Sequence, residues 1–287
     1  MSLIAILLAL GAEYFLGSVD EYRRFHWFQD FIERVRARFA QHAWADGPVG
    51  VIIAFAPVLA VVAMAWWVAG ALLWILGFLF TVAALVYALG PKNLEQDTSG
   101  YFDAVDRGDH EGAAWYASEM LGAEAAGTPQ QVAQRMYEAV FIQANERVLG
   151  VLFWFIVLGP IGAVLFRLGC EARRWFPEQE GGFAKSLHDL HRILIWPSAR
   201  IVSLGYALAG SFVGAVSRWG NMSEFWQRDS EGLLVASGAG ALNHHEAEPD
   251  SETPDVARVR DALALTKRTL VVAIVVLALM TLAGWAG

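Results

Sequence analysis

The stretch EAVFIQANERVLGVLFWFIVLGPIGAVLFRLGCEARR, residues 138–174, decides what kind of fold this chain adopts. It places Asn145, Glu146 and Arg147 directly before a long and almost wholly apolar run. That run approaches the roughly 20 residues that a helix needs to cross a hydrocarbon core. A carboxylate and a guanidinium at the mouth of such a segment either anchor a helix at the lipid surface or belong to a binding site.

The rest of the chain also favours a membrane protein, because 56% of its residues are hydrophobic and only 17% are charged. No charged residue occurs from Gly47 to Gly90. A single helix of that length would run roughly 60 Å, twice the hydrocarbon thickness. The block therefore predicts two spans, near Val49–Met64 and Val68–Leu89, with a turn at Trp66–Trp67. A last apolar block covers Thr269–Trp285.

We predict an all-α polytopic membrane protein with about four main apolar segments plus cytoplasmic or interfacial helices. The N-terminal stretch lacks a basic region and carries Glu13 within its apolar run, so we interpret it as a retained helix and not as a signal peptide. Phenylalanines that recur between arginines over residues 23–39 predict a basic amphipathic helix on the cytoplasmic side. Packing of that helix on the protein's own spans is the alternative.

Composition divides the chain into segments whose boundaries follow the changes between apolar and polar sequence. These segments are 1–48, an apolar helix and a basic amphipathic helix; 49–90, a transmembrane hairpin; 91–147, a polar helical insert; 148–168, a transmembrane or re-entrant segment; 169–267, interfacial helices and an acidic linker; and 268–287, a C-terminal transmembrane helix.

The segment 148–168 leaves two topologies open. A full span would carry the basic residues that follow it to the opposite side of the membrane, against the positive-inside rule. Gly159-Pro160 lies in the middle of the block and is a natural helix break. A re-entrant hairpin that turns at this point would keep almost all lysines and arginines cytoplasmic, so the charge pattern favours it.

The polar insert contains two local signals. Thr128-Pro129-Gln130-Gln131 predicts a helix start with Thr128 as N-cap and Gln131 completing a capping box. Arg107-Gly108-Asp109 predicts a break between two short helices.

Three side-chain groups elsewhere could bind a ligand, but each has a simpler explanation. His188 and His191 are three residues apart on one predicted helix face, which suits a metal but is more typical of a surface helix. His244-His245 lies in the acidic linker, where a solvated loop is the simpler interpretation. Cys170 is the single cysteine, and we expect it to be a small buried residue.

The sequence resembles the AmpE-type inner-membrane proteins of the AmpE/CbiB/CobD superfamily over essentially its whole length. The resemblance lies in ALGAEYFLG (residues 9–17), ANERVLGVLFWFIVLGPIG (144–162), WPSARIVSLGYALAG (196–210) and a C-terminal apolar block after Lys267-Arg268. For the AmpE type it implies a multi-pass protein of the bacterial inner membrane with a signalling role in peptidoglycan recycling and β-lactamase induction. For the CbiB type it implies an enzyme that forms an amide bond in cobalamin biosynthesis.

The motifs that the CbiB-type enzymes carry are degraded in this sequence. Their E-N-x-x-D-G motif corresponds to the stretch that begins at Ala144, which keeps Asn145 but lacks the glutamate and the aspartate. Their N-T-L-D-S-M motif corresponds to residues 167–172 and loses its asparagine and aspartate. An ATP-dependent ligation needs carboxylates that hold a metal against phosphate oxygens. The loss favours a binding and signalling protein over an enzyme, with a CbiB-like enzyme of altered active site as the alternative.

The resemblance and the charges together define the expected site. We expect no catalytic residue, no metal and no cofactor, and a ligand-binding pocket formed by Glu13, Asn145, Glu146, Arg147 and Arg200. The expected partners are the lipid bilayer and a muropeptide or a protein. A net charge of −8 argues against nucleic acid.

Overall fold

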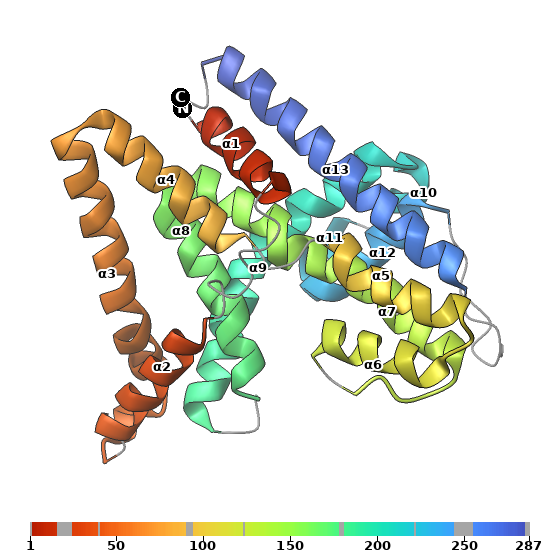
Figure 1. The fold of residues 1–287 in the computed structure, drawn as a ribbon, viewed down its shortest axis with the longest axis horizontal. Helices are drawn as coiled ribbons and strands as arrows, with labels where there is room; N and C mark the ends of the chain where they lie inside the picture. Colours follow the sequence, from red (N-terminus) through yellow and green to blue (C-terminus); the bar gives the residue numbers. More distant parts are fainter. Residues whose placement is uncertain are drawn as a thin grey trace. The chain divides into compact units, whose positions relative to one another are not determined.

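A computed structural model of the chain describes residues 2–15, 25–39, 41–89, 94–122, 124–177, 181–220, 222–243 and 255–284. Every regular element within these ranges is helical and none is a strand, which confirms the all-α prediction (Figure 1). The elements are α1 (Ser2–Phe15), α2 (His26–Phe39), a 3-10 turn (Ala43–Ala45), α3 (Pro48–Leu72), α4 (Trp74–Ala88), α5 (Leu94–Asp106), α6 (His110–Leu121), α7 (Pro129–Ala144), a π-helical turn (Asn145–Leu149), α8 (Gly150–Trp175), α9 (Gly182–Ala209), α10 (Phe212–Trp219), α11 (Met222–Gln227), α12 (Ser230–Ala241) and α13 (Val256–Leu282).

The described helices have the length and composition of a polytopic membrane protein. Three helical stretches are long and apolar enough to cross a membrane: Pro48–Leu72, Pro129–Trp175 and Val256–Leu282. Ser2–Ala12 and Trp74–Ala88 are shorter apolar helices. The last apolar block is the C-terminal part of α13, which begins at Val256. His244, His245 and most of the acidic linker lie outside the described residues.

The chain forms two compact units. The first, which we call the hairpin unit, contains the described residues of Met1–Pro91, Glu146–Ser198 and Ala278–Gly287. The second, which we call the insert unit, contains those of Lys92–Asn145 and Ala199–Leu277.

The core of the hairpin unit explains the pattern of helix α2. Phe28 and Ile32 of α2 are completely buried, and the ring of Phe28 meets that of Phe55 edge to face at 5.1 Å. Helix α2 packs on α3 and α8, so its apolar stripe covers the protein's own helices. The guanidinium of Arg36 lies 5.2 Å from the ring of Phe176, which places a cation over the core aromatics. The predicted amphipathic helix is therefore confirmed, with its apolar face on the protein.

The hairpin between α3 and α4 turns later than the sequence predicts. The predicted turn at Trp66–Trp67 is wrong, because α3 continues to Leu72 and the chain is extended at Leu73. The reason is a close approach of two glycines, since a Cβ added to Gly77 would lie 2.9 Å from the Cα of Gly70. A side chain at Gly77 would separate the two backbones, so the absence of one at Gly77 permits the turn at Leu73.

Both local signals in the insert unit are confirmed. The Thr128 side chain accepts a hydrogen bond from the Gln131 backbone, and the Gln131 side chain accepts one from the Thr128 backbone, which completes the capping box at α7. Gly108 has a φ of 71° and forms the turn between α5 and α6. The carboxylate of Asp109 then caps α6 by accepting from the Gly112 N–H.

Helix α8 reverses its direction at Gly159 and Pro160. Gly159 has φ 65° and ψ −153°, outside the helical region, and proline has no N–H to continue the ladder. A Cβ added to Gly162 would lie 2.3 Å from the carbonyl oxygen of Trp154. Residues with this sequence separation lie about 12 Å apart in a straight helix, so the chain must fold back between them. The apolar segment is therefore a helical hairpin, the shape that the re-entrant alternative requires.

The two arms of this hairpin are joined by ion pairs at their open end. Glu146, before the first arm, contacts Arg173 at 3.0 Å and Arg174 at 3.1 Å, both near the end of the second arm. A straight helix would separate Glu146 from Arg173 by about 40 Å. On the side of α9, the indole N–H of Trp154 donates to the carbonyl of Leu194 at 2.9 Å and fixes α9 against the first arm.

The reversal of α8 at Gly159 leads to a prediction about the stability of the folded chain. Substitution Gly162→Ala should lower the free energy of unfolding by about 1–3 kcal/mol, because the new methyl group would overlap a backbone carbonyl that no rotamer change can move. Denaturant unfolding in detergent measures the effect. Gly11→Ala is the matched control, since a Cβ there meets nothing within 4 Å. Equal stability of the two variants would contradict the reversal at Gly159.

The ion pairs make a second prediction. Glu146→Gln keeps the shape of the side chain but leaves Arg173 and Arg174 without their counter-charge, so the free energy of unfolding should fall by about 2–4 kcal/mol. The matched control is Asp189→Asn, which removes a surface ion pair with Arg192 and should cost less than about 1 kcal/mol. A loss at Glu146 no greater than at Asp189 would show that the hairpin is held by other contacts.

Candidate functional site

The π-helical turn Asn145–Leu149 carries the charged residues that precede the apolar hairpin. Turns of this kind widen a helix locally and are frequent at functional sites. Glu146 is 0% exposed and Arg147 is 7% exposed. An arginine that anchors a helix at the lipid surface would keep its guanidinium exposed, so the interpretation of Arg147 as such an anchor is wrong. Both residues instead belong to the interior.

The carboxylate of Glu146 is surrounded by hydrogen-bond donors. Oε1 accepts from Nη2 of Arg173 at 3.0 Å and lies 3.0 Å from Nε2 of His191. Oε2 accepts from Nη2 of Arg174 at 3.1 Å. A buried carboxylate without such partners would be very costly, and charge-assisted hydrogen bonds are among the strongest that a protein makes. The three partners therefore hold the carboxylate in one position and in its ionised form.

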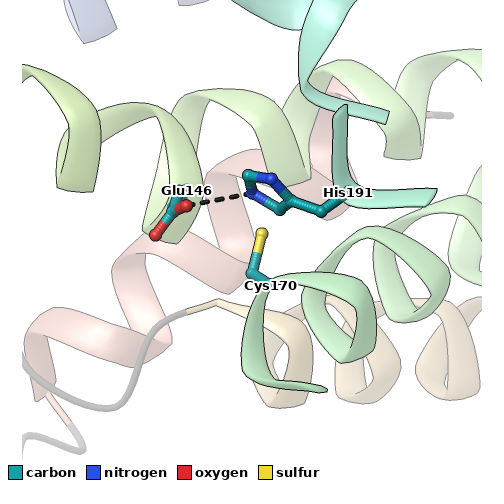
Figure 2. A group of neighbouring side chains, drawn as sticks. All are labelled: Glu146, Cys170 and His191. Carbon is teal, nitrogen blue, oxygen red and sulfur yellow. Dashed lines mark hydrogen bonds and ion pairs between the residues drawn. The ribbon is translucent and has the colours of Figure 1, made fainter. Parts of the chain in front are cut away.

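A thiol joins the carboxylate and the imidazole. Figure 2 shows the sulfur of Cys170, on the second arm of α8, directed towards Glu146 and the ring of His191 on α9. One ligand atom of each residue lies within 4.8 Å of those of the other two. Cys170 is 1% exposed and His191 is 3% exposed. The expectation that Cys170 is buried is confirmed, and the expectation that His191 lies on a surface helix is wrong.

These three groups have two kinds of chemistry. A thiol, an imidazole and a carboxylate can act as nucleophile, base and orienting group. The sulfur of Cys170 is too deeply buried for a substrate carbonyl to reach it in this arrangement. The same three groups are also ligands that a transition metal accepts.

A further arginine lies one helical turn before Cys170. Arg167 is 1% exposed, forms an ion pair with Glu171 and places its guanidinium 5.6 Å from the ring centre of Phe25. Its Nε and Nη1 atoms make no hydrogen bond with the part of the chain that the structure describes. Buried guanidinium nitrogens are usually satisfied, so two donors without an acceptor in the described part of the chain are unusual.

The residues that the sequence predicts for one pocket belong to both units, so each is described within its own unit. Arg200, in the insert unit, donates to the Ser230 hydroxyl at 2.7 Å and to the carbonyls of Trp226 and Arg228 at 3.2 and 2.7 Å. Its described partners thus give it a structural role at the start of α12. Asn145 is completely buried, and Glu13 lies in α1, where its side chain is outside the described part.

Sequence reasoning missed Arg167, Arg173 and Arg174 as site residues and favoured other roles for Cys170 and His191. One signal was present, because Arg167, Cys170 and Arg174 follow each other at helical spacing behind an apolar arm. Ionisable residues in such a position usually face the interior of a bundle and have a function. The contact of His191 with Glu146 could not be predicted from the sequence, because the two residues are far apart in the chain and no local pattern relates them.

Comparisons with known proteins identify the family of this chain. A family model described as CobD/Cbib protein matches residues 6–247. A cobalamin biosynthesis protein CobD of Stutzerimonas stutzeri (strain A1501) is 30% identical over 176 residues, 58% of this chain and 56% of the relative. The protein of the same name in Chromobacterium violaceum is 32% identical over 199 residues, 66% of this chain and 62% of the relative. Each match thus spans less than two thirds of the CobD relative.

A protein with a different name is also similar. Protein AmpE of Shigella flexneri is 24% identical over 225 residues, 72% of this chain and 77% of the relative. No solved structure matches the chain. Since the family model covers most of the sequence, from the apolar helix α1 past the end of α12, the chain belongs to the CobD/Cbib protein family.

Proposed function

We propose that this chain is a multi-pass protein of the bacterial inner membrane that acts by binding a ligand or a partner, as an AmpE-type regulatory protein. The role that the AmpE resemblance implies is in peptidoglycan recycling and β-lactamase induction. The observation that carries the proposal is the state of Glu146, whose carboxylate already binds two arginines and a histidine.

This state does not suit the enzyme reaction of the CbiB type. A ligation driven by ATP needs carboxylate oxygens that are open to Mg²⁺, which prefers an octahedral set of oxygen ligands. In the described part of the hairpin unit, Glu146 is bound by Arg173 and Arg174, and Glu171 is paired with Arg167. Cations occupy the places that Mg²⁺ would need, which agrees with the degraded motifs on either side of the apolar hairpin.

The balance of charge suits an anion instead. Arg167, Arg173 and Arg174 outnumber the carboxylates of Glu146 and Glu171, and Arg147 adds a further buried guanidinium. The two unsatisfied nitrogens of Arg167 supply hydrogen-bond donors for an acceptor. Guanidinium N–H groups are strong hydrogen-bond donors to carboxylates and phosphates. An anionic cell-wall fragment such as a muropeptide has the required chemistry.

The similarities to relatives support each candidate in a different way. The AmpE alignment covers more of this chain and more of the relative than either CobD alignment does. The CobD proteins are more similar per aligned residue, and this favours the second candidate, a membrane enzyme that forms an amide bond in cobalamin biosynthesis with an altered active site. The environment of Glu146 leads us to prefer the first.

The proposal predicts a stabilising ligand. Thermal unfolding of the detergent-purified chain is measured with muropeptides, anhydro-muropeptides, ATP–Mg²⁺ and cobyric acid analogues. A muropeptide present at 100 times its dissociation constant should stabilise the folded state by about 2.7 kcal/mol. Arg167→Gln should abolish that shift, because it removes the unsatisfied donors. The control Arg192→Gln, at an exposed surface ion pair, should retain it.

Any other outcome of this unfolding experiment would contradict the proposed function or the proposed binding site. A shift with ATP–Mg²⁺ or with a cobyric acid analogue would favour the enzyme. A muropeptide shift that survives in Arg167→Gln would move the binding site elsewhere. If no compound shifts the unfolding temperature, the small-ligand version is wrong and a protein partner is left as the mode of regulation.

A further inference from the structure

We propose that Glu146, Cys170 and His191 form a binding site for a zinc ion inside the hairpin unit. The site departs from the expectation, based on sequence alone, that this chain binds no metal. It shares Glu146 with the site of the proposed regulatory function, but it requires no anionic ligand.

The geometry is close to that of a three-ligand zinc site. The nearest ligand atoms of the three side chains all lie within 4.8 Å of one another. In tetrahedral sites, Zn–S distances near 2.3 Å and Zn–N distances near 2.0 Å put neighbouring ligand atoms about 3.3–3.8 Å apart. Oε1 of Glu146 and Nε2 of His191 are already 3.0 Å apart, so only the sulfur of Cys170 would have to approach, by at most about 1 Å, which small rotations of the χ angles provide.

The three ligands are held by separate parts of the fold. Glu146 lies on the π-helical turn, Cys170 on the second arm of α8 and His191 on α9 (Figure 2). The reversal at Gly159 brings the first two together, and the hydrogen bond from Trp154 to Leu194 fixes α9 beside them. All three are buried, so water competes little for the same positions. A site built this way is preorganised before the ion arrives.

The identity of the ligands selects the metal. Thiolate and imidazole are preferred by zinc and similar borderline-soft ions, whereas Mg²⁺ and Ca²⁺ prefer a set of oxygen ligands. Three protein ligands leave one coordination position open, as in zinc sites that bind water or an exchangeable ligand. The single carboxylate that Glu146 contributes therefore suits zinc, even though the same residue is unsuited to Mg²⁺–ATP.

Arg173 and Arg174 lower the affinity of the site for zinc, but they leave part of the Glu146 carboxylate free to bind the ion. An ionised carboxylate has about four lone-pair positions, of which Arg173 and Arg174 use two. The position that faces Nε2 of His191 is the one the ion would take. Zinc binding releases the proton of the Cys170 thiol to solvent, and Nε2 of His191 binds the ion through its lone pair in the tautomer that carries the ring proton on Nδ1. The ion, the thiolate and the carboxylate then carry no net charge together, and the arginines stay on the outer lone pairs.

A cobalt titration tests the proposal directly. The full chain, purified in detergent with an affinity tag that contains no histidine, is treated with a chelator and titrated with Co²⁺. Because Cys170 is the only cysteine, any thiolate-to-cobalt charge-transfer band in the near ultraviolet must come from it. We expect one Co²⁺ per chain, visible bands of tetrahedral intensity, and loss of all bands when Zn²⁺ is added.

Variants establish which side chains bind the ion. Cys170→Ser should remove the charge-transfer band, and His191→Gln should weaken Co²⁺ binding at least tenfold. His188→Gln is the matched control: it lies one turn earlier on α9, its Nδ1 contacts the carbonyl of Ala184, and it should bind Co²⁺ like the unmodified chain. Cys170→Ala, which keeps a small apolar group at the position, is the second variant in case the serine disturbs the core.

The result that overturns the proposal is equally clear. It is wrong if the folded, unmodified chain shows no charge-transfer band at saturating Co²⁺, or if His191→Gln binds as tightly as His188→Gln. Thermal unfolding of each metal-free variant confirms that it is folded before the titration. The assay contains the metal alone, so its failure would leave the binding of an anionic ligand at the arginines unaffected.

Discussion

The buried carboxylate of Glu146 is the constraint on which the hairpin unit depends. A charge inside an apolar segment must find compensating partners. Arg173 and Arg174 provide them from the far end of the same segment. They can reach Glu146 only if the chain turns back between, and Gly159-Pro160 lies at the midpoint where that turn has to be. The ion pairs and the break therefore require each other.

The same folding-back creates the candidate site. Once the second arm lies beside the π-helical turn, Cys170 and Arg167 are carried to the carboxylate, and α9 adds His191. The family includes proteins with different names and, by resemblance, different roles, and a shared fold cannot decide between them. Our preference between the candidates rests on how Glu146 is occupied: the surplus of arginines around it suits the binding of an anion, and the adjacent thiol and imidazole suit a transition metal.

Much of the fold follows from signals that act over a few residues. The apolar blocks, the capping box at Thr128, the turn at Gly108 and the break at Gly159 all depend on side chains within about one or two helical turns. The turn between α3 and α4 does not follow from such signals. Trp66 and Trp67 suggested an interfacial turn, but the close contact of Gly70 with Gly77 moves it to Leu73. That contact exists only when the two helices are already packed.

The sequence alone therefore determined the class of the protein, an all-α membrane protein of this family, and it identified Glu146 as a residue of interest. It also left a helix that folds back at Gly159-Pro160 among its alternatives, because helix breakers are local properties. Only the tertiary structure decided that Glu146 faces Arg173, Arg174 and His191, that Arg200 binds Ser230, and that His188 and His191 lie in different environments. These contacts join residues that are tens of positions apart, so they depend on how the helices fold back on one another, which helical periodicity does not specify.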